Sequence, residues 1–397
     1  MTWTPWRSVV AFGVVSLAAD MVYEGMRSIA GPFLGSLGAS AVTVGVVTGA
    51  GEAIALALRL VTGPLADRTG RHWGLTTLGY GLTAVCVPLL AVTPFLGAAG
   101  VGVASVLMLA ERTGKAVRSP SKSALLAGIA ASVGRGRGFA VHKALDQIGA
   151  FAGPLVVATC AALSGELWLG FLVLAVPGAV SLVLLARLRR NAPVDEPAPR
   201  PTEHHERARL PRAFRLFAVS CSASTLGLMT FGVMSYAFVE ADLVSLALVP
   251  VVYAGAMALE ALGALGTGFA YDRWGARVLF PLPLLVAAVP ALVFTHALGA
   301  VLAGVALWGL ATGIQDSTVK ALVADLVPWP SLATAYGVFA AAQGGAALVG
   351  GVLAGALYAH HLGVLVTVVG LLQLVALVTL VAALRQRVGT PGVGSGA

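Results

Sequence analysis

Four polar side chains with the spacing of one helix face lie inside the first long apolar segment of this sequence. They are Asp20, Tyr23, Glu24 and Arg27, at positions i, i+3, i+4 and i+7, which a helix places on a single face. Ionisable groups inside a bilayer are costly and need a partner, water or a function, so this face cannot meet lipid. We expect it to line a watered interior between helices.

Charged residues with helical spacing recur in three further apolar segments of the first half, so these faces should meet in a shared interior. The candidate residues for proton coupling and for a substrate cavity are Asp20, Tyr23, Glu24, Arg27, Glu52, Arg59, Glu111, Arg112, Lys115, Arg118, Lys143 and Asp146. The second half has fewer such groups, namely Glu260, Gln315, Asp316 and Lys320. The sequence therefore predicts titrating chemistry in the first half and a mostly apolar wall, with aromatic and amide groups, in the second.

Asp20 and Glu24 are one helical turn apart and are the residues best suited to carry a proton. A carboxylate beside other acids favours its neutral form, whereas a nearby arginine favours the ionised form. Both acids could therefore gain and lose a proton as access alternates between the two sides of a membrane. The alternative is that they neutralise Arg27, Arg59 or Arg112 in static ion pairs.

Four basic residues, Lys115, Arg118, Lys122 and Lys143, are expected near the inner mouth of this interior. A basic cavity could attract an anionic substrate. The same side chains could instead extend to the membrane interface as anchors, and we favour that role for Arg118 and Lys122. His142 is expected to be structural or interfacial, with a role in a proton relay as the alternative.

The composition places the chain in a membrane. It is 58% hydrophobic and 11% charged, with a mean hydropathy of +0.90, whereas soluble proteins are about 25% charged. The formal charge of +8 is therefore not a sign of nucleic-acid binding. A spanning helix needs about 20 mostly apolar residues. On that basis twelve spans are predicted, near residues 8–34, 40–62, 74–93, 97–117, 137–162, 168–187, 213–236, 246–267, 278–296, 299–318, 335–358 and 363–384.

Lysine and arginine are unevenly distributed over the turns between these spans. If the N-terminus is cytoplasmic, the outer turns contain neither residue, which places both termini and the central linker on the cytoplasmic side of the inner (plasma) membrane. A segment rich in proline and mixed charge divides the chain. The predicted domains are an N-terminal six-helix bundle over 1–190, a cytoplasmic linker over 191–212, a C-terminal six-helix bundle over 213–387 and a disordered tail over 388–397.

A short polar signature occurs twice, about half a chain apart. In each copy a glycine precedes an aspartate by four positions, an arginine follows the aspartate directly, and a second glycine comes three positions after it. The matching residues are Gly63, Asp67, Arg68, Gly70 and Arg71 in the first copy and Gly268, Asp272, Arg273, Gly275 and Arg277 in the second. Such an offset indicates an internal duplication.

This signature resembles the loop between the second and third helices of the major facilitator superfamily and its weaker repeat between the eighth and ninth. The resemblance implies an all-α membrane protein of two six-helix bundles related by a pseudo-two-fold axis, with gating loops and a central cleft. Arg112, followed by Gly114, is similar to the intramembrane arginine that the family associates with proton movement; Arg118 is a second candidate. Gly149, Gly153 and Pro154 are similar to the glycine–proline element of its exporters, although helix packing alone also explains them.

The leading hypothesis is a monomeric secondary transporter that works by alternating access, uses a proton gradient and no cofactor, and exports a small drug-like or metabolite molecule. A proton-coupled importer of a small organic anion and a lipid flippase are the alternatives. The sequence has no GxxxxGK(S/T) loop for ATP and no HExxH or GxSxG motif in a suitable setting. We therefore expect no enzyme and no metal site, and we expect the partners to be substrate, protons and membrane lipid, without nucleic acid.

Overall fold

The computed structural model describes residues 3–192, 210–328 and 332–388, and every regular element in these ranges is a helix. The first half contains α1 (Pro5–Ser36), α2 (Ala41–Ala57), α3 (Arg59–Thr69), α4 (His72–Leu89), η1 (Leu90–Ala99), α5 (Gly100–Ile129), η2 (Ala130–Ser132), α6 (Arg135–Ser164), α7 (Leu167–Val173) and α8 (Ala175–Asn191). The second half contains α9 (Arg212–Gly227), α10 (Phe231–Glu240), α11 (Val249–Trp274), η3 (Gly275–Leu279), α12 (Pro281–Val293), α13 (Leu298–Leu326), α14 (Leu332–Leu357) and α15 (Leu362–Val388). The predicted linker and tail fall mainly on residues 193–209 and 389–397, outside the described ranges.

Ten helical stretches in the described ranges are long and apolar enough to cross a membrane. One of them, His72–Ser132, contains two antiparallel helices, because α4 and α5 pack against each other and the chain turns between them at Gly97. The φ of Gly97 is 54°, a backbone conformation that glycine adopts without steric cost. A shorter apolar helix, Pro281–Val293, completes the set. With the long stretch divided and α12 added, each of the twelve predicted spans has a helical counterpart.

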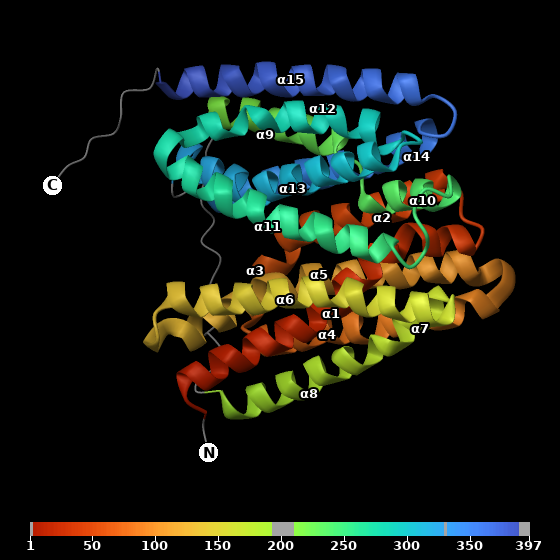
Figure 1. The fold of residues 1–397 in the computed structure, drawn as a ribbon. Coiled ribbons are helices and arrows are strands. Elements are labelled where there is room, and N and C mark those ends of the chain that lie inside the picture. Colours follow the sequence, from red (N-terminus) through yellow and green to blue (C-terminus); the bar gives the residue numbers. More distant parts are fainter. Residues whose placement is uncertain (1–2, 193–209, 329–331, 389–397) are drawn as a thin grey trace.

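The helices form two bundles that lie side by side, one above the other in Figure 1. In the first bundle α1 packs on α6 and α8, and in the second α11 packs on α13 and α9 packs on α15. The bundles meet where α2 contacts α14, where α6 contacts α11 and where α1 contacts α10. The second span of each bundle thus meets the fifth span of the other, as a two-fold relation between the bundles requires. The predicted fold class is confirmed.

The α2–α14 contact brings two backbones directly together. A Cβ added at Gly45 would collide with the carbonyl group of Gly351, and a Cβ added at Gly351 would collide with that of Gly45. Small residues at such positions let membrane helices approach closely, with dispersion contacts in place of a hydrophobic driving force. The bundles are therefore closely packed along the α2–α14 contact.

The glycine–proline element of α6 forms a similar contact within the first bundle. Gly149 packs against the carbonyl of Leu17 on α1, and Gly153 packs against that of Met21. These glycines therefore perform the packing role that the sequence analysis gave as the simpler explanation of the motif.

We expect Gly149→Val to destabilise the first bundle by about 1–3 kcal/mol, because the new side chain would overlap the α1 backbone. The matched control is Gly255→Val on α11, where an added Cβ has no neighbour within 4 Å. Thermal unfolding in detergent, followed by size-exclusion chromatography, measures the difference. Equal unfolding midpoints for the two variants would contradict the packing role.

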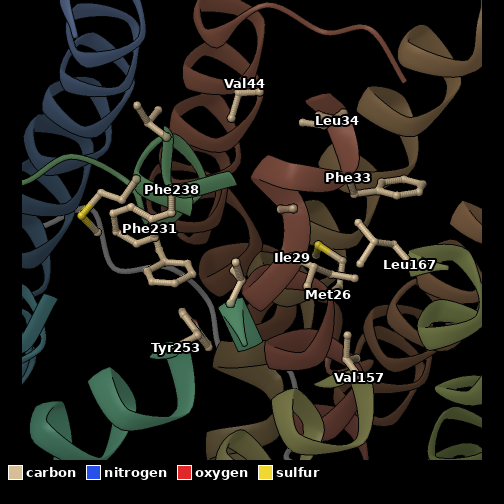
Figure 2. Close-up of a cluster of buried hydrophobic side chains, with 14 of the residues drawn as sticks. Met26, Ile29, Phe33, Leu34, Val44, Val157, Leu167, Phe231, Phe238 and Tyr253 are labelled. Carbon is tan, nitrogen blue, oxygen red and sulfur yellow. The ribbon is translucent and has the colours of Figure 1, made fainter. Parts of the chain in front are cut away.

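An apolar core shared by both bundles closes the end of the molecule opposite the chain termini. Figure 2 shows Ile29, Phe33 and Leu34 of α1 in the same cluster as Phe231 and Phe238 of α10. Each of these side chains is at most 3% exposed. Since these residues come from both halves of the chain, the core holds the bundles together at this end, and opening there requires it to separate.

The repeated signature is more helical than the sequence analysis assumed. Most of each copy belongs to the last turns of a helix, α3 in the first case and α11 in the second, rather than to a loop. Each helix ends at a glycine with positive φ, Gly70 at 66° and Gly275 at 60°. These glycines terminate the helices in conformations that other residues rarely adopt. The duplicated spacing thus marks two equivalent helix ends.

Candidate transport cavity

A cavity of about 360 Å³ lies between the two bundles. Its walls come from α1, α2, α3, α5 and α6 on one side and from α9, α11, α13 and α14 on the other. It extends from Arg27 and Thr230 to Lys143, whose side chain is 67% exposed. The exposed Lys143 lies near the start of α6, at the end of the molecule where α1 begins and α15 ends, so the cavity opens there (Figure 1).

The second half contributes irregular backbone to this wall. The helices α9 and α10 are interrupted at Leu228–Thr230, and these residues line the cavity. Non-helical backbone at membrane depth is tolerated where it is buried in protein or lines a watered space. The Nε1–H of Trp308 donates a hydrogen bond to the free carbonyl of Met229 at 2.9 Å. This hydrogen bond from α13 fixes the position of the non-helical segment.

The floor of the cavity is a cluster of two arginines, one glutamate and one tyrosine from three helices. The Arg27 guanidinium lies 2.9 Å from Oε1 of Glu52, and Arg112 forms an ion pair with the same oxygen. Arg112 also donates a hydrogen bond to the Tyr23 hydroxyl. Arg27, Glu52 and Arg112 also line a smaller void of about 40 Å³, which reaches Met26 and other residues of the shared core. The cluster therefore lies between the open cavity and the closed end.

Glu24 joins this floor to the second bundle. Its Oε2 atom lies 3.3 Å from Nη1 of Arg27 and accepts a hydrogen bond of 2.5 Å from the hydroxyl of Tyr253 on α11. Tyr253 was not among the site residues predicted from the sequence. The available signal was that Tyr253, Met257 and Glu260 follow at i, i+4 and i+7, so that they share one face of α11, on which Met257 and Glu260 line the cavity.

A second charge cluster surrounds Arg118, which is only 3% exposed. Its Nη1 atom donates to the hydroxyl of Thr83 at 2.5 Å and lies 4.0 Å from Glu111, and its Nη2 atom lies 3.8 Å from Asp20. The Thr83 hydroxyl in turn donates to Glu111 at 3.1 Å. Glu111 has no exposed surface and does not line the cavity. The expected anchoring role of Arg118 is therefore wrong, because its head group is buried between α1, α4 and α5.

Asp146 holds the third cluster together. Its carboxylate lies 3.8 Å from Lys122 and 3.2 Å from Lys143. It also accepts a hydrogen bond of 2.7 Å from Ser16, to which Lys122 donates as well, at 3.1 Å. Lys122 thus turns inward instead of reaching the interface as expected. The pairing of Lys143 with Asp146 was visible in the sequence, whereas Ser16 and Lys122 come from other helices.

His142 lies away from the cavity. It is 5% exposed, its ring stacks on Phe12 at 5.7 Å, and neither ring nitrogen has a hydrogen-bond partner in the described part of the chain. This position fits the expected structural role of His142. A proton relay would need a hydrogen bond to one of the ring nitrogens, and no residue in the described ranges forms one.

Two of the cations that line the cavity, Lys115 and Arg59, differ from the others in their ion pairing. Within the described ranges Lys115 and Arg59 form no ion pair, whereas Arg27, Arg112, Arg118, Lys122 and Lys143 each do. The Nζ atom of Lys115 lies 3.5 Å from the ring centroid of Tyr23, a cation–π contact that leaves its three N–H donors available. The buried Nε atom of Arg59 has no hydrogen-bond partner among the described residues.

Amide and hydroxyl groups form the middle of the second-half wall. Thr225 donates to Oε1 of Gln315 at 3.2 Å, and Gln343 donates to Thr225 at 3.3 Å. Trp308 and Thr312 of α13 complete this surface beside Glu260. The expected aromatic and amide groups are present, but the expectation of a mostly apolar wall is wrong, because hydroxyl groups and the carboxylates of Glu260 and Asp316 also line it.

The fold agrees with the comparisons with known proteins. The family model of the Major Facilitator Superfamily matches residues 12–266. An uncharacterized protein of Mycobacterium tuberculosis (strain ATCC 25618 / H37Rv) is 50% identical over 396 residues, which cover 96% of this chain and 94% of the relative. The chain therefore belongs to the major facilitator superfamily. It is a multi-pass membrane protein and a secondary transporter of that family, and not an enzyme.

Solved structures show the same fold at low sequence identity. A bacterial homolog of the human lysosomal transporter Spinster, in an inward-facing and occupied conformation, has a TM-score of 0.71 at 14% identity and covers 97% of this chain and 96% of its own. A mutant of the nucleoside transporter NupG has a TM-score of 0.74 at 14% identity, with 95% and 99% covered. At this identity the likeness establishes the fold and says nothing about the substrate.

Proposed function

We propose that this chain is a proton-coupled secondary transporter whose central cavity binds a small organic anion. The observation that supports an anion is the pair of cavity cations, Lys115 and Arg59, that form no ion pair within 4.0 Å in the described ranges. An uncompensated cation at membrane depth is costly unless water or a ligand satisfies it. This charged cavity is less suited to the drug-like export substrate that the sequence analysis favoured.

The relative direction of proton and substrate movement follows from how protonation of the cavity acids changes the attraction of the neighbouring cations for a substrate anion. Asp20 lies near Arg118, and Glu24 lies near Arg27, on the wall that also carries Lys115. A proton on either acid removes one negative charge beside its arginine, so the arginine attracts an anion more strongly, while Arg27 keeps Glu52 and Arg118 keeps Glu111 as partners. Entry of a proton and binding of an anion then support each other, which favours movement of both in the same direction. We therefore propose symport of the anion with protons.

Alternating access requires the closed end to separate. Two polar contacts between the bundles lie there, the bond from Tyr253 to Glu24 and a 2.7 Å hydrogen bond between the hydroxyls of Thr48 and Thr230. Protonation of Glu24 removes the charge that strengthens the first of these bonds. We propose that the loss of this charge promotes opening at that end, while the closely packed α2–α14 contact guides the rocking motion.

The proposed orientation places both termini in the cytoplasm. The cavity then opens inward, since it opens at the end where α1 begins. The segment between Asn191 and Arg212 divides the chain into the two proposed bundle domains. Cysteine accessibility at exposed loop positions in whole cells tests this orientation.

Proton coupling is tested in proteoliposomes that contain a pH-sensitive dye. A panel of small carboxylates is added under an imposed pH gradient, and the proton flux that each acid induces is recorded. We expect at least one acid to drive flux, and we expect Asp20→Asn and Glu24→Gln each to lower it at least tenfold while the acid still binds. The control is Glu166→Gln in the exposed α6–α7 turn. Flux that is unchanged in both variants would remove these acids from the coupling role, and absence of acid-driven flux would overturn the proposed function.

A further inference from the structure

The ionic groups of the cavity do not all cancel one another. Of the acids in the first-half wall, Asp20, Glu24, Glu52 and Asp146 each lie within 4.0 Å of a cation. After these pairs are formed, positive charge remains on the first bundle and a carboxylate, Glu260, remains on the second. The cavity is therefore dipolar, with its positive side on the first bundle.

Glu260 is the group that the proposed anion does not explain. It lines the cavity from α11, one turn beyond Met257, and it forms no hydrogen bond or ion pair with any residue in the described ranges. Asp316, the other acid of this wall, has an interaction of its own. A partnerless carboxylate at membrane depth is costly and marks a functional position. An anion alone would leave Glu260 unsatisfied and would be repelled by it.

We propose that the substrate is amphoteric: a small molecule that carries an anionic group for Lys115 and Arg59 and a cationic group, such as an amine, for Glu260. This inference rests on the proposed function and restricts its substrate class from small organic anions to those that also carry a cationic group. Opposite charges on two walls also orient the molecule, because only one of its two orientations matches both walls.

The wall around Glu260 fits a cationic group with further hydrogen-bonding atoms. Trp308 contributes an aromatic ring to the same cavity, and aromatic rings attract ammonium groups. The buried Nε2 atom of Gln315 has no hydrogen-bond partner among the described residues and offers a donor to a polar atom of the substrate. The volume of about 360 Å³ is near the lower end of the range for small-molecule pockets. The substrate is therefore small.

The two bundles hold opposite ends of such a molecule, so binding would link them across the cavity. A ligand with one charge contacts one bundle and biases the rocking motion little. A ligand with both charges draws the walls together, which is how differential binding shifts a conformational equilibrium. The amphoteric substrate would thereby trigger closure of the open end.

The experiment uses the full chain in detergent and matched sets of probes. Each set contains an amino acid or dipeptide, the same compound without its amino group, and the same compound without its carboxylate. Affinity is measured by calorimetry and supported by thermal stabilisation. We expect an amphoteric probe to bind at least tenfold more tightly than both of its analogues. We expect Glu260→Gln to abolish this preference by weakening the binding of the amphoteric probe, and to bind the amine-free acid at least as tightly as the unmodified chain does, because the repulsion from Glu260 is removed.

A control variant and three contrary results test this inference separately from the proposed function. Asp242→Asn removes one exposed acid from the second half, at a position with φ of 52° that asparagine tolerates, and should retain the preference. Amine-free acids that bind as tightly as the amphoteric probes, a preference that survives in Glu260→Gln, or no binding of any amphoteric probe would each overturn the inference. Proton flux driven by an amine-free acid would keep the proposed function in each of these cases.

Discussion

Replacement of Arg118 by methionine is expected to remove most of the folded protein. The Glu111 side chain has no exposed surface, and one of its oxygens already lacks a hydrogen-bond partner among the described residues. Without Arg118 its charge would be buried with only the Thr83 hydroxyl for support. Breaking one partner of a buried ion pair costs about 3–5 kcal/mol. Thermal unfolding and the yield of monodisperse protein in size-exclusion chromatography measure this loss.

A double variant separates the loss of charge balance from the loss of the arginine itself. Arg118→Met combined with Glu111→Gln removes both charges, and replacement of a whole buried pair is often close to neutral. We expect it to recover at least half of the lost stability. Asp20 loses its partner too, but it faces the cavity, where water can solvate it. Arg215→Met, at an exposed position of α9, is the control. A double variant no more stable than Arg118→Met would show that Glu111 is not the source of the cost.

Replacement of Lys115 by methionine is expected to weaken substrate binding by about tenfold to a hundredfold. A hydrogen bond to a charged group contributes about 1.5–3 kcal/mol, and methionine keeps the length of the side chain without its charge. The protein should fold, because Lys115 forms no ion pair in the described ranges whose loss would leave a buried acid. The affinity of the carboxylate that drives the largest proton flux, measured by calorimetry, gives the result.

Two further variants define what Lys115 contributes. Lys115→Arg keeps the charge and should retain part of the affinity, whereas Arg215→Met changes the net charge equally at an exposed position and should leave affinity intact. If Lys115→Met bound the acid as tightly as the unmodified chain, the substrate anion would have to lie elsewhere. In that case Arg59 would be the remaining cation without a partner.

The helices of this protein were predictable because a bilayer imposes a length and a polarity on each span. The predicted ends of the helices were less accurate. Where polar residues follow an apolar span, the helix continues beyond its predicted end. The fourth span was predicted near 97–117, yet α5 is Gly100–Ile129, and the tenth was predicted near 299–318, yet α13 is Leu298–Leu326. Hydropathy measures where apolar residues stop, whereas backbone hydrogen bonds continue the helix through Arg118, Ser121 and Lys122.

The inward direction of most charged residues in the first half was predictable for a related reason. Spacing places Asp20, Tyr23, Glu24 and Arg27 on one helix face, and the cost of exposing that face to lipid directs it inward. Eleven of the twelve proposed site residues line the cavity. Glu111 is the exception, because it turns toward α4 and binds Thr83 there.

The sequence alone determined that the chain is a duplicated twelve-span membrane protein with charged faces turned inward, since helical periodicity and hydropathy are local properties. Only the tertiary structure decided which charges cancel. Glu52 pairs with Arg112 and Arg27, and Tyr253 reaches Glu24 from the other bundle. Lys115, Arg59 and Glu260 have no such partner in the described ranges. The energy of an ion pair depends on the distance between its two charges. When the charges lie on different helices, that distance is set by how the helices pack, and the spacing of residues along one helix does not predict it.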